Sequence, residues 1–322
     1  MVIRFDTAAV NVGSLARLQT IFGQRLQTGV RLDRFTSARV GGAAEVLLEV
    51  DSAEELEQAA TLLWSEALPW KLLGGGSNVL VSDTGVRGVV VINRARKVRF
   101  DEDTDPPTVW AESGANFGLV ARQAAIRGLS GLEWAAGIPG TVGGAVAGNA
   151  GAHGGDMAGN LIVATILHRN TEDGAPVRET WPVERLEYAY RSSLLQRMLG
   201  KAVVLDAQLS LQRSTPEEVQ AQIDKFVNYR RLTQPPGASM GSMFKNPPGD
   251  YAGRLIEAAG LKGVQVGDAQ ISTLHANFFI NHGEATAADV YALIELAKRI
   301  VAEKFGVHLV LEIELVGDWL GR

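Results

Sequence analysis

The residues of this sequence whose types and spacing most suggest chemistry are clustered glycines. Glycine occupies 36 of the 322 positions and gathers at 74–76, 137–155 and 237–263. In the segment Leu72–Leu80 (LLGGGSNVL), Gly74, Gly75 and Gly76 lie between two runs of strand-forming residues. Consecutive amides without Cβ atoms can point at one anion, and Ser77 and Asn78 can add side-chain donors. From this segment alone, a glycine-rich hairpin with no ligand explains the pattern equally well.

The residues after this first loop exclude one kind of nucleotide site. A dinucleotide fingerprint of the Rossmann kind needs a helix that opens directly after the glycines, so that its N-terminus faces the pyrophosphate. Here the next residues are Val79, Leu80 and Val81, which favour a strand. The loop therefore predicts a backbone nest and not a Rossmann turn.

A second cluster, 137–151 (GIPGTVGGAVAGNAG), changes the balance between these interpretations. It is too rich in glycine to be a stable helix in isolation, since each glycine costs about 1 kcal/mol relative to alanine. It is also too apolar for a solvated linker. Buried small residues imply a bulky or anionic partner that fills the space. Two such loops favour a dinucleotide cofactor over a lone phosphate or a purely structural role.

Alternating strand and helix patterns must position these loops. Strands are predicted at 44–50, 70–73, 79–82, 89–93, 108–112, 162–168, 176–181, 203–209 and 307–316. Helices are predicted after Ser52, over 116–127, from Thr215 to about Arg230, near 250–259, and from Thr286 to Gly306. Capping-box spacing marks three helix starts, with Glu55, Glu218 and Asp289 as the partners of the capping residues. The pattern indicates an α+β protein with a larger nucleotide-type domain to about residue 212 and a smaller C-terminal domain.

Composition excludes several classes of function. The net charge is −5 without a basic stripe, which argues against a nucleic-acid partner. No cysteine is present, and the five histidines lack metal-ligand spacing, so we expect neither a disulfide nor a metal site. No apolar run reaches the length of a membrane span, and residues 1–15 do not read as a signal peptide. We therefore expect a cytoplasmic protein that does not bind membranes.

Five motifs carry a family resemblance. They are GGGSNVLVSD (74–83), GLEWAAGIPGTVGGAVAGNAGAHGG (131–155), YRSS (190–193), GSMFKNP (241–247) and LEIEL (311–315). Together with 39–42, 252–263 and 275–278, they resemble the UDP-N-acetylenolpyruvoylglucosamine reductase family over nearly the whole chain. The resemblance implies an FAD-binding domain of the vanillyl-alcohol-oxidase and cresol-methylhydroxylase type at 1–212, in two subdomains split near 95. It also implies a smaller C-terminal α+β substrate-binding domain at 213–322.

The resemblance also implies a reaction and its residues. NADPH would reduce non-covalently bound FAD, which would pass hydride to the enolpyruvyl group of a UDP-sugar, giving UDP-N-acetylmuramate for peptidoglycan. Arg191 would stabilise the developing negative charge, Ser242 would donate the proton, and Glu314 would orient or polarise the substrate. The expected cofactor contacts are Gly74, Gly75, Gly76, Ser77, Asn78, Gly114, Gly137, Pro139, Gly140, Thr141, Gly143, Gly144 and Asn149. The expected substrate contacts are Tyr190, Asn246 and Lys262.

Several alternatives stay open at this stage. Ser239 competes with Ser242, and Glu312 competes with Glu314 because alternation puts both glutamates on one face of a strand. Lys245 is a hypothetical aid to Ser242. Only residues 192–241 separate Arg191 from Ser242, so we expect the shorter subtype, without a tyrosine lid over the diphosphate.

Two other functions compete with the reductase. A flavin oxidase of the same superfamily would hold FAD covalently, and His153 is the nearest histidine to a glycine loop. A nucleotide-sugar-binding protein without turnover would have lost Arg191, Ser242 or Glu314, and all three are present. We expect a monomer.

Overall fold

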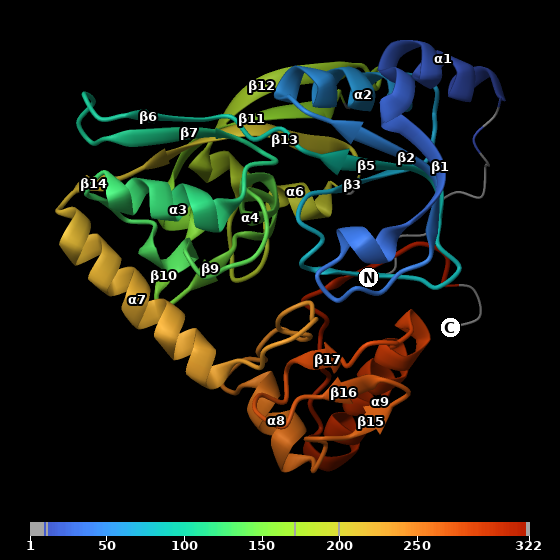
Figure 1. The fold of residues 1–322 in the computed structure, drawn as a ribbon, viewed down its shortest axis with the longest axis vertical. Helices are drawn as coiled ribbons and strands as arrows, with labels where there is room; N and C mark the ends of the chain where they lie inside the picture. The colour runs from blue at the N-terminus through green and yellow to red at the C-terminus, as the bar shows by residue number, and fades with distance from the viewer. Residues whose placement is uncertain (1–9, 11, 171, 199, 320–322) are drawn as a thin grey trace.

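A computed structural model describes residues 10, 12–170, 172–198 and 200–319. The fold has three parts along the chain, coloured blue, green to yellow, and orange to red in Figure 1. The expectation that no signal peptide is present concerns residues that lie mostly outside the described range. No helix within that range is long and apolar enough to cross a membrane.

The first part is a four-stranded sheet covered by two helices. Its strand order is β1 (Leu26–Arg31), β2 (Ala43–Val50), β5 (Val86–Asn93) and β3 (Trp70–Leu73). The helices α1 (Val12–Phe22) and α2 (Ala53–Ser65) pack on one face, against Val46, Leu48 and Val91, among others. Ser52 caps α2 as predicted, accepting from the Glu55 amide. The carboxylate of Glu55 instead accepts from the Asp51 amide, so the reciprocal half of the predicted capping box is wrong.

The second part is a five-stranded antiparallel sheet. Its order is β12 (Pro176–Pro182), β11 (Leu161–Arg169), β13 (Ala202–Ser210), β7 (Thr108–Glu112) and β6 (Val98–Asp101). The helices α3 (Phe117–Ile126) and α4 (Val142–Gly148) lie beside this sheet (Figure 1). Its smaller elements are β8 (Leu129–Ser130), η3 (Glu133–Ala135), β9 (Gly151–Ala152), β10 (Gly155–Asp156), α5 (Met157–Asn160), η4 (Val183–Leu186), α6 (Leu194–Arg197) and β14 (Gln212–Arg213), whereas η1 (Gly23–Arg25) and η2 (Leu32–Phe35) flank β1 in the first part.

The helix α4 forms within the second glycine cluster, which is too rich in glycine for a stable helix in isolation. Thr141 caps it by accepting from the Gly144 amide, and Asn149 ends it in the left-handed conformation, at φ 45°. Its residues Ala145 and Val146 are buried in the core of the second part. Tertiary packing therefore offsets the low helix propensity of its glycines.

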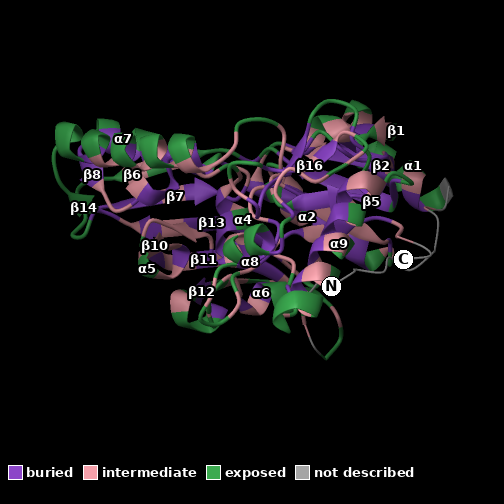
Figure 2. Ribbon diagram, turned by 90° about the horizontal axis from the view of Figure 1, so that it is seen from below, coloured by how far each residue is buried: buried purple, intermediate pink, exposed green. Residues whose placement is uncertain are grey.

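The long helix α7 (Pro216–Thr233) starts at the predicted cap, Thr215, and runs three residues past the expected end. We expected it to open the C-terminal domain. Instead Val219 and Ile223 share the hydrophobic core of the second part, where α7 contacts α3 and η3. Its outer face is exposed (Figure 2). The core of the C-terminal part draws its residues from Met240 onward, with three further side chains from the first part.

The C-terminal part packs two helices against a small sheet. The sheet is β15 (Gln265–Val266), β16 (Ala269–Ile271) and β17 (Phe279–Asn281), and the helices are α8 (Ala252–Ala258) and α9 (Ala287–Phe305). The capping box at Thr286 and Asp289 forms with both of its hydrogen bonds. Asp83, from the first glycine motif, accepts from the amides of Ala287 and Ala288. A carboxylate there stabilises the positive end of the α9 dipole and ties this part to the first.

The last predicted strand, 307–316, is shorter than expected. Only β18 (Glu314–Val316) is a strand, and it pairs in parallel with β4 (Val79–Val81). The residues before it contact another loop, where Leu311 bridges to Phe244. Because the segment changes partners, no continuous ladder forms. The predicted alternation of burial still holds, since Leu309 and Ile313 are buried while Val310 is 60% exposed.

Candidate active site

The two glycine loops lie directly against each other. The Ser77 hydroxyl donates to the Pro139 carbonyl at 3.2 Å. A Cβ atom on Gly75 would lie 3.0 Å from Gly140 Cα, and one on Gly74 would lie 2.4 Å from Thr141 Oγ1. The structure thus brings together the residues that the sequence separated into two clusters, and only glycine permits the approach.

Backbone donors in these loops are left without protein partners. The amides of Gly75, Gly76, Ser77, Gly140 and Thr141 donate no hydrogen bond to any other residue that the structure describes. Unpaired backbone N–H groups require an acceptor, either water or a ligand. Five such donors from two touching loops fit the diphosphate of a dinucleotide such as FAD.

The other glycines expected at the cofactor have close neighbours within the protein. A Cβ atom would lie 2.6 Å from the Ala95 carbonyl at Gly114, 2.9 Å from Arg230 Cδ at Gly137, and 2.7 Å from Ser113 Cβ at Gly143. These contacts account for glycine at the three positions. Gly144, in contrast, is exposed, and the nearest atom to its Cβ position is Thr141 Oγ1 at 3.6 Å.

Asn149 is buried and uses both groups of its side-chain amide inside the protein. Nδ2 donates to the Ala189 carbonyl at 3.1 Å, and Oδ1 accepts from the Ala158 amide at 3.0 Å. Its left-handed backbone ends α4. The side chain therefore holds the YRSS segment in place beside the glycine cluster.

Arg191 lies in the loop between η4 and α6, with an unusual backbone φ of 51°. Its Nε donates to Glu312 Oε1 at 2.9 Å, and Nη2 donates to the Gly151 carbonyl at 2.7 Å. A longer bond of 3.4 Å joins Nη1 to the Asn149 carbonyl. The guanidinium carbon is 5.6 Å from the ring centre of Tyr190, whose side chain is exposed. Arg191 thus connects the second glycine cluster to the LEIEL segment.

The GSMFKNP segment joins the same cluster. The Lys245 ammonium donates to the Arg191 carbonyl at 2.7 Å, and the Met243 carbonyl accepts from the Glu312 amide at 3.0 Å. Lys245 therefore binds the backbone of the YRSS motif, and a contribution of its charge to Ser242 stays a prediction. Three motifs that are distant in sequence are in direct contact.

Ser242 lies beside a cleft of about 380 Å³ in the C-terminal part. Asn246, Arg254, Glu257 and His275 also line this cleft. The Asn246 side chain accepts from the first amide of α8. Burial, with a smaller effect of nearby Lys262, lowers the pKa of His275. Ser239, the rival of Ser242, is not among the lining residues.

Lys262 lies at the edge of this cleft, where it forms an ion pair with the lining residue Glu257. Its Nζ lies 2.8 Å from Glu257 Oε1. Lys262 and Asn246, two predicted substrate contacts, therefore lie near Ser242, whereas Tyr190 lies beside Arg191.

The two glutamates of the LEIEL segment bind different partners. Glu312 binds Arg191, whereas Glu314 forms an ion pair with Lys71 of β3. Burial raises the pKa of Glu312, although Arg191 and Lys245 oppose this. Asn78 binds the backbone of this segment twice. Its side-chain Nδ2 donates to the Glu312 carbonyl at 3.1 Å, and its backbone carbonyl accepts from the Glu314 amide at 2.9 Å. The first glycine loop therefore positions both glutamates.

Sequence reasoning missed Lys71. It belongs to no motif, and its only signal is a charged residue in the short apolar strand WKLL. Its side chain is only 18% exposed, and its ammonium faces Glu314. A buried lysine requires a partner, so the unusual residue type could have pointed to a nearby carboxylate without identifying it.

Comparisons with known proteins decide the family. Residues 44–167 match the FAD binding domain family, and residues 232–316 match the C-terminal domain of UDP-N-acetylenolpyruvoylglucosamine reductase. The enzyme of that name from Chloroflexus aggregans is 45% identical over 88% of this chain and 95% of its own length. The chain belongs to the UDP-N-acetylenolpyruvoylglucosamine reductase family. The reductase of Rubrobacter xylanophilus is 44% identical over 92% of this chain and 98% of its own.

A solved structure of the reductase family agrees with the fold. The reductase of Thermus caldophilus superposes with a TM-score of 0.74 at 38% identity, covering 89% of this chain and 97% of that one. The predicted family and the predicted FAD-binding and C-terminal α+β architecture are confirmed. The described segment between Arg191 and Ser242 contains α6, β13, β14 and α7. The shorter subtype without a tyrosine lid stays a prediction.

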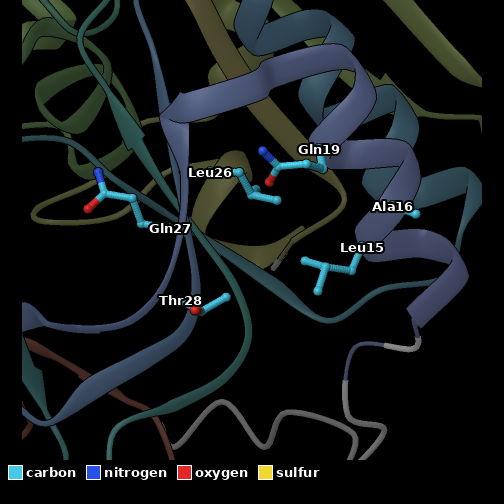
Figure 3. A pocket seen from close by; sticks show the side chains of 6 residues that line it. All are labelled: Leu15, Ala16, Gln19, Leu26, Gln27 and Thr28. Atoms are coloured by element: carbon cyan, nitrogen blue, oxygen red, sulfur yellow. The ribbon is translucent and has the colours of Figure 1, made fainter.

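Two other features contain none of the predicted site residues. A cavity of about 460 Å³ opens between α1 and β1, lined by Leu15, Ala16, Gln19, Leu26, Gln27 and Thr28 (Figure 3). It contains no titratable side chain and no predicted site residue. His153, the candidate anchor of the oxidase alternative, stacks on Phe226 of α7 at 4.3 Å between ring centres. No group of three or more His, Asp or Glu residues in the described ranges could hold a metal ion.

Proposed function

We propose that this chain reduces the enolpyruvyl group of UDP-N-acetylglucosamine enolpyruvate to give UDP-N-acetylmuramate. NADPH is the proposed reductant, FAD the non-covalent cofactor and the cytoplasm the location. The observation that carries the proposal is the direct contact of the YRSS, GSMFKNP and LEIEL segments beside the two glycine loops. When bound, FAD supplies two-electron transfer between the nicotinamide and the substrate.

The loops would hold the cofactor through their backbone. The unpaired amides of Gly75, Gly76, Ser77, Gly140 and Thr141 are suited to the diphosphate oxygens. Gly74 permits the contact between the loops, and Asn78 links them to the LEIEL segment. The proposed cofactor site is therefore continuous with the proposed catalytic residues.

Arg191 would stabilise the charge that develops during reduction. Reduction of an enol ether next to a carboxylate builds negative charge on that carboxylate, and a fixed cation stabilises it. An arginine side chain carries five N–H donors, and Glu312, Asn149 and Gly151 use three of those of Arg191. The remaining two, one on each terminal nitrogen, suit the two oxygens of a carboxylate.

Ser242 would supply the proton that completes the reaction. Its hydroxyl makes no hydrogen bond with any described residue, and Ser242 lines the cleft. A hydroxyl is a weak acid, so the donor must be close to the carbon that accepts the proton. Glu314, fixed by Lys71, would orient the enolpyruvyl group.

The cleft of the C-terminal part suits the nucleotide end of the substrate. Arg254 lines it and Lys262 lies at its edge, and both carry the positive charge that a diphosphate requires. The exposed aromatic side chain of Tyr251 offers a surface for a base. Asn246 and Tyr190 remain proposed contacts.

The proposal is tested by the two half-reactions. The purified flavin-loaded protein is reduced with NADPH without oxygen, and UDP-N-acetylglucosamine enolpyruvate is then added. We expect the absorbance of oxidised flavin to return at once, with one equivalent of UDP-N-acetylmuramate. If the absorbance stays bleached until air is admitted, the protein is an oxidase and the proposal fails. Sedimentation of the same sample tests the proposed monomer.

Replacing Ser242 by alanine should slow the second half-reaction by on the order of 10²–10⁴-fold, because general acid catalysis contributes that much. Reduction of the flavin by NADPH should be unchanged, since it needs no proton from this hydroxyl. The matched control is Ser239→Ala, which removes a hydroxyl from the same loop and should stay within about twofold of the wild type. Deuterium incorporation at the lactyl carbon at the full rate in Ser242→Ala would rule out Ser242 as the donor.

A further inference from the structure

The loop that carries Arg191 is bound to the C-terminal end of α4 by two hydroxyl groups that have no role in the proposed function. The Tyr188 hydroxyl donates to the Val146 carbonyl at 2.7 Å, and the Ser193 hydroxyl donates to the Ala147 carbonyl at 2.6 Å. We propose that Tyr188 and Ser193 are positioning residues, which fix the turn at Arg191 on α4 so that its guanidinium faces the carboxylate of the substrate. This inference rests on the proposed function and deepens it.

The residues between these two hydroxyl groups form a tight turn. Ala189 and Ser192 each donate their amide to the carbonyl of the other at 3.1 Å, so Tyr190 and Arg191 form the tip. Arg191 has a φ of 51° at the second of the two tip positions, where a positive φ favours glycine. Because an arginine in this conformation is strained, contacts from outside the turn must hold it.

The end of α4 supplies acceptors for both flanks of this turn. The last bond within the helix ends at the Ala145 carbonyl. The next two carbonyls, of Val146 and Ala147, accept no amide in the part of the chain that the structure describes, as is usual for the last turn of a helix. Tyr188 and Ser193 therefore satisfy two consecutive acceptors that the helix leaves open.

The Tyr188 hydroxyl is a donor that does not titrate in the ordinary range. Burial raises the pKa of Tyr188 far above its usual value, and nearby Asp156 adds to this. The ring packs on the same hydrophobic core as Val146, its acceptor residue. The bond to α4 thus persists at any pH at which the protein is folded and assayed.

The residues after α4 bind the rest of the same turn. The Asn149 side chain donates to the Ala189 carbonyl at 3.1 Å. The Arg191 guanidinium donates to the carbonyls of Gly151 and Asn149 at 2.7 and 3.4 Å. Since one helix end binds the flanks, the backbone and the guanidinium, a turn that moves away from α4 carries the guanidinium with it. A displacement of about 1 Å is enough to impair a reaction.

Removing the Tyr188 hydroxyl tests the inference. Tyr188→Phe keeps the ring in the core but leaves the Val146 carbonyl without its donor. We expect the substrate to reoxidise the reduced protein about fivefold to tenfold more slowly, because a neutral hydrogen bond changes the population of the bound turn by about that factor. Reduction by NADPH should be unchanged, since no carboxylate reacts in that step. Anaerobic stopped-flow spectroscopy measures both rates.

Binding without turnover gives a second readout. The product UDP-N-acetylmuramate offers Arg191 a carboxylate but has no double bond to reduce. We expect Tyr188→Phe to raise the Kd of this product for the oxidised, flavin-loaded protein by the same factor, as measured by calorimetry. The matched control is Tyr229→Phe, which removes a hydroxyl from a 59% exposed side chain of α7. It should match the wild type in both readouts.

A double-mutant cycle with Arg191→Ala distinguishes positioning from a general loss of stability. If Tyr188 acts through Arg191, Tyr188→Phe should change the reoxidation rate by less than about twofold when residue 191 is already alanine. Equal slowing in both backgrounds would overturn the inference. Ser193→Ala should give the same pattern, and it replaces Tyr188→Phe in the cycle should that variant not retain flavin.

The outcomes separate this inference from the proposed function. If Tyr188→Phe and Ser193→Ala match Tyr229→Phe in reoxidation rate and in the Kd of the product, neither hydroxyl positions Arg191, although the reductase reaction stands. If the wild type itself is not reoxidised by the substrate, the proposed function fails and this inference fails with it.

Discussion

An Arg191→Ala variant is expected to be reoxidised by the substrate on the order of 10²–10³-fold more slowly than the wild type. This is the usual effect of removing a preorganised hydrogen-bond donor that faces charge developing in the transition state. The Arg191 side chain is 26% exposed, and Glu312 and the carbonyls of Asn149 and Gly151 bind its guanidinium, so water cannot replace it in the same geometry. Reduction by NADPH should keep the wild-type rate, because no carboxylate reacts in that step. Anaerobic stopped-flow spectroscopy of each half-reaction measures the two rates separately.

Two further variants test whether the effect at residue 191 comes from its charge, from the planar shape of the guanidinium, or from its position in the chain. Arg191→Lys keeps the charge but loses the planar fork, and its rate should fall between those of alanine and the wild type. Arg197→Ala breaks an exposed ion pair with Glu187 in the same segment and should behave as the wild type. Equal rates for Arg191→Ala and Arg197→Ala would show that Arg191 does not stabilise the reaction.

Local chemistry explains why many elements could be predicted from the sequence. The caps at Ser52, Thr215 and Thr286 mark helix starts because a side-chain oxygen satisfies an amide that the helix leaves free. Elsewhere distant contacts override local preference. The helix α4 forms because its buried face packs on a core, and the strand expected at 307–316 breaks because the segment changes partners.

The candidate site shows the same limit. The motifs identify Arg191, Ser242 and the two glutamates, but alternation along one strand cannot distinguish Glu312 from Glu314. They differ only through Arg191 and Lys71, which come from elements remote in sequence. Which carboxylate faces which cation is a property of the tertiary packing, so no spacing rule within the LEIEL segment could have assigned it.

The first glycine loop should tolerate no side chain at Gly76. With φ of 59°, a Cβ atom there would lie 1.8 Å from the Phe35 carbonyl oxygen, whereas real contacts rarely fall below 3.0 Å. The Gly76 carbonyl also accepts from the Ser37 amide, so relief of the overlap would disturb both segments. We expect Gly76→Ala to lower the free energy of unfolding by about 4 kcal/mol or more and to purify without flavin. Urea unfolding and the flavin-to-protein absorbance ratio measure the two effects.

Gly23→Ala is the matched control, because Gly23 has nearly the same φ, 57°, but no atom within 4 Å of its Cβ position. It should lose only the cost of a left-handed alanine, about 1–2 kcal/mol, and retain its flavin. The difference between the two variants isolates the overlap at Phe35 from the shared backbone cost. Equal losses of stability, with flavin retained in both, would mean that the loop yields to a side chain. The close approach of the backbone at Gly76 would then not be required for cofactor binding.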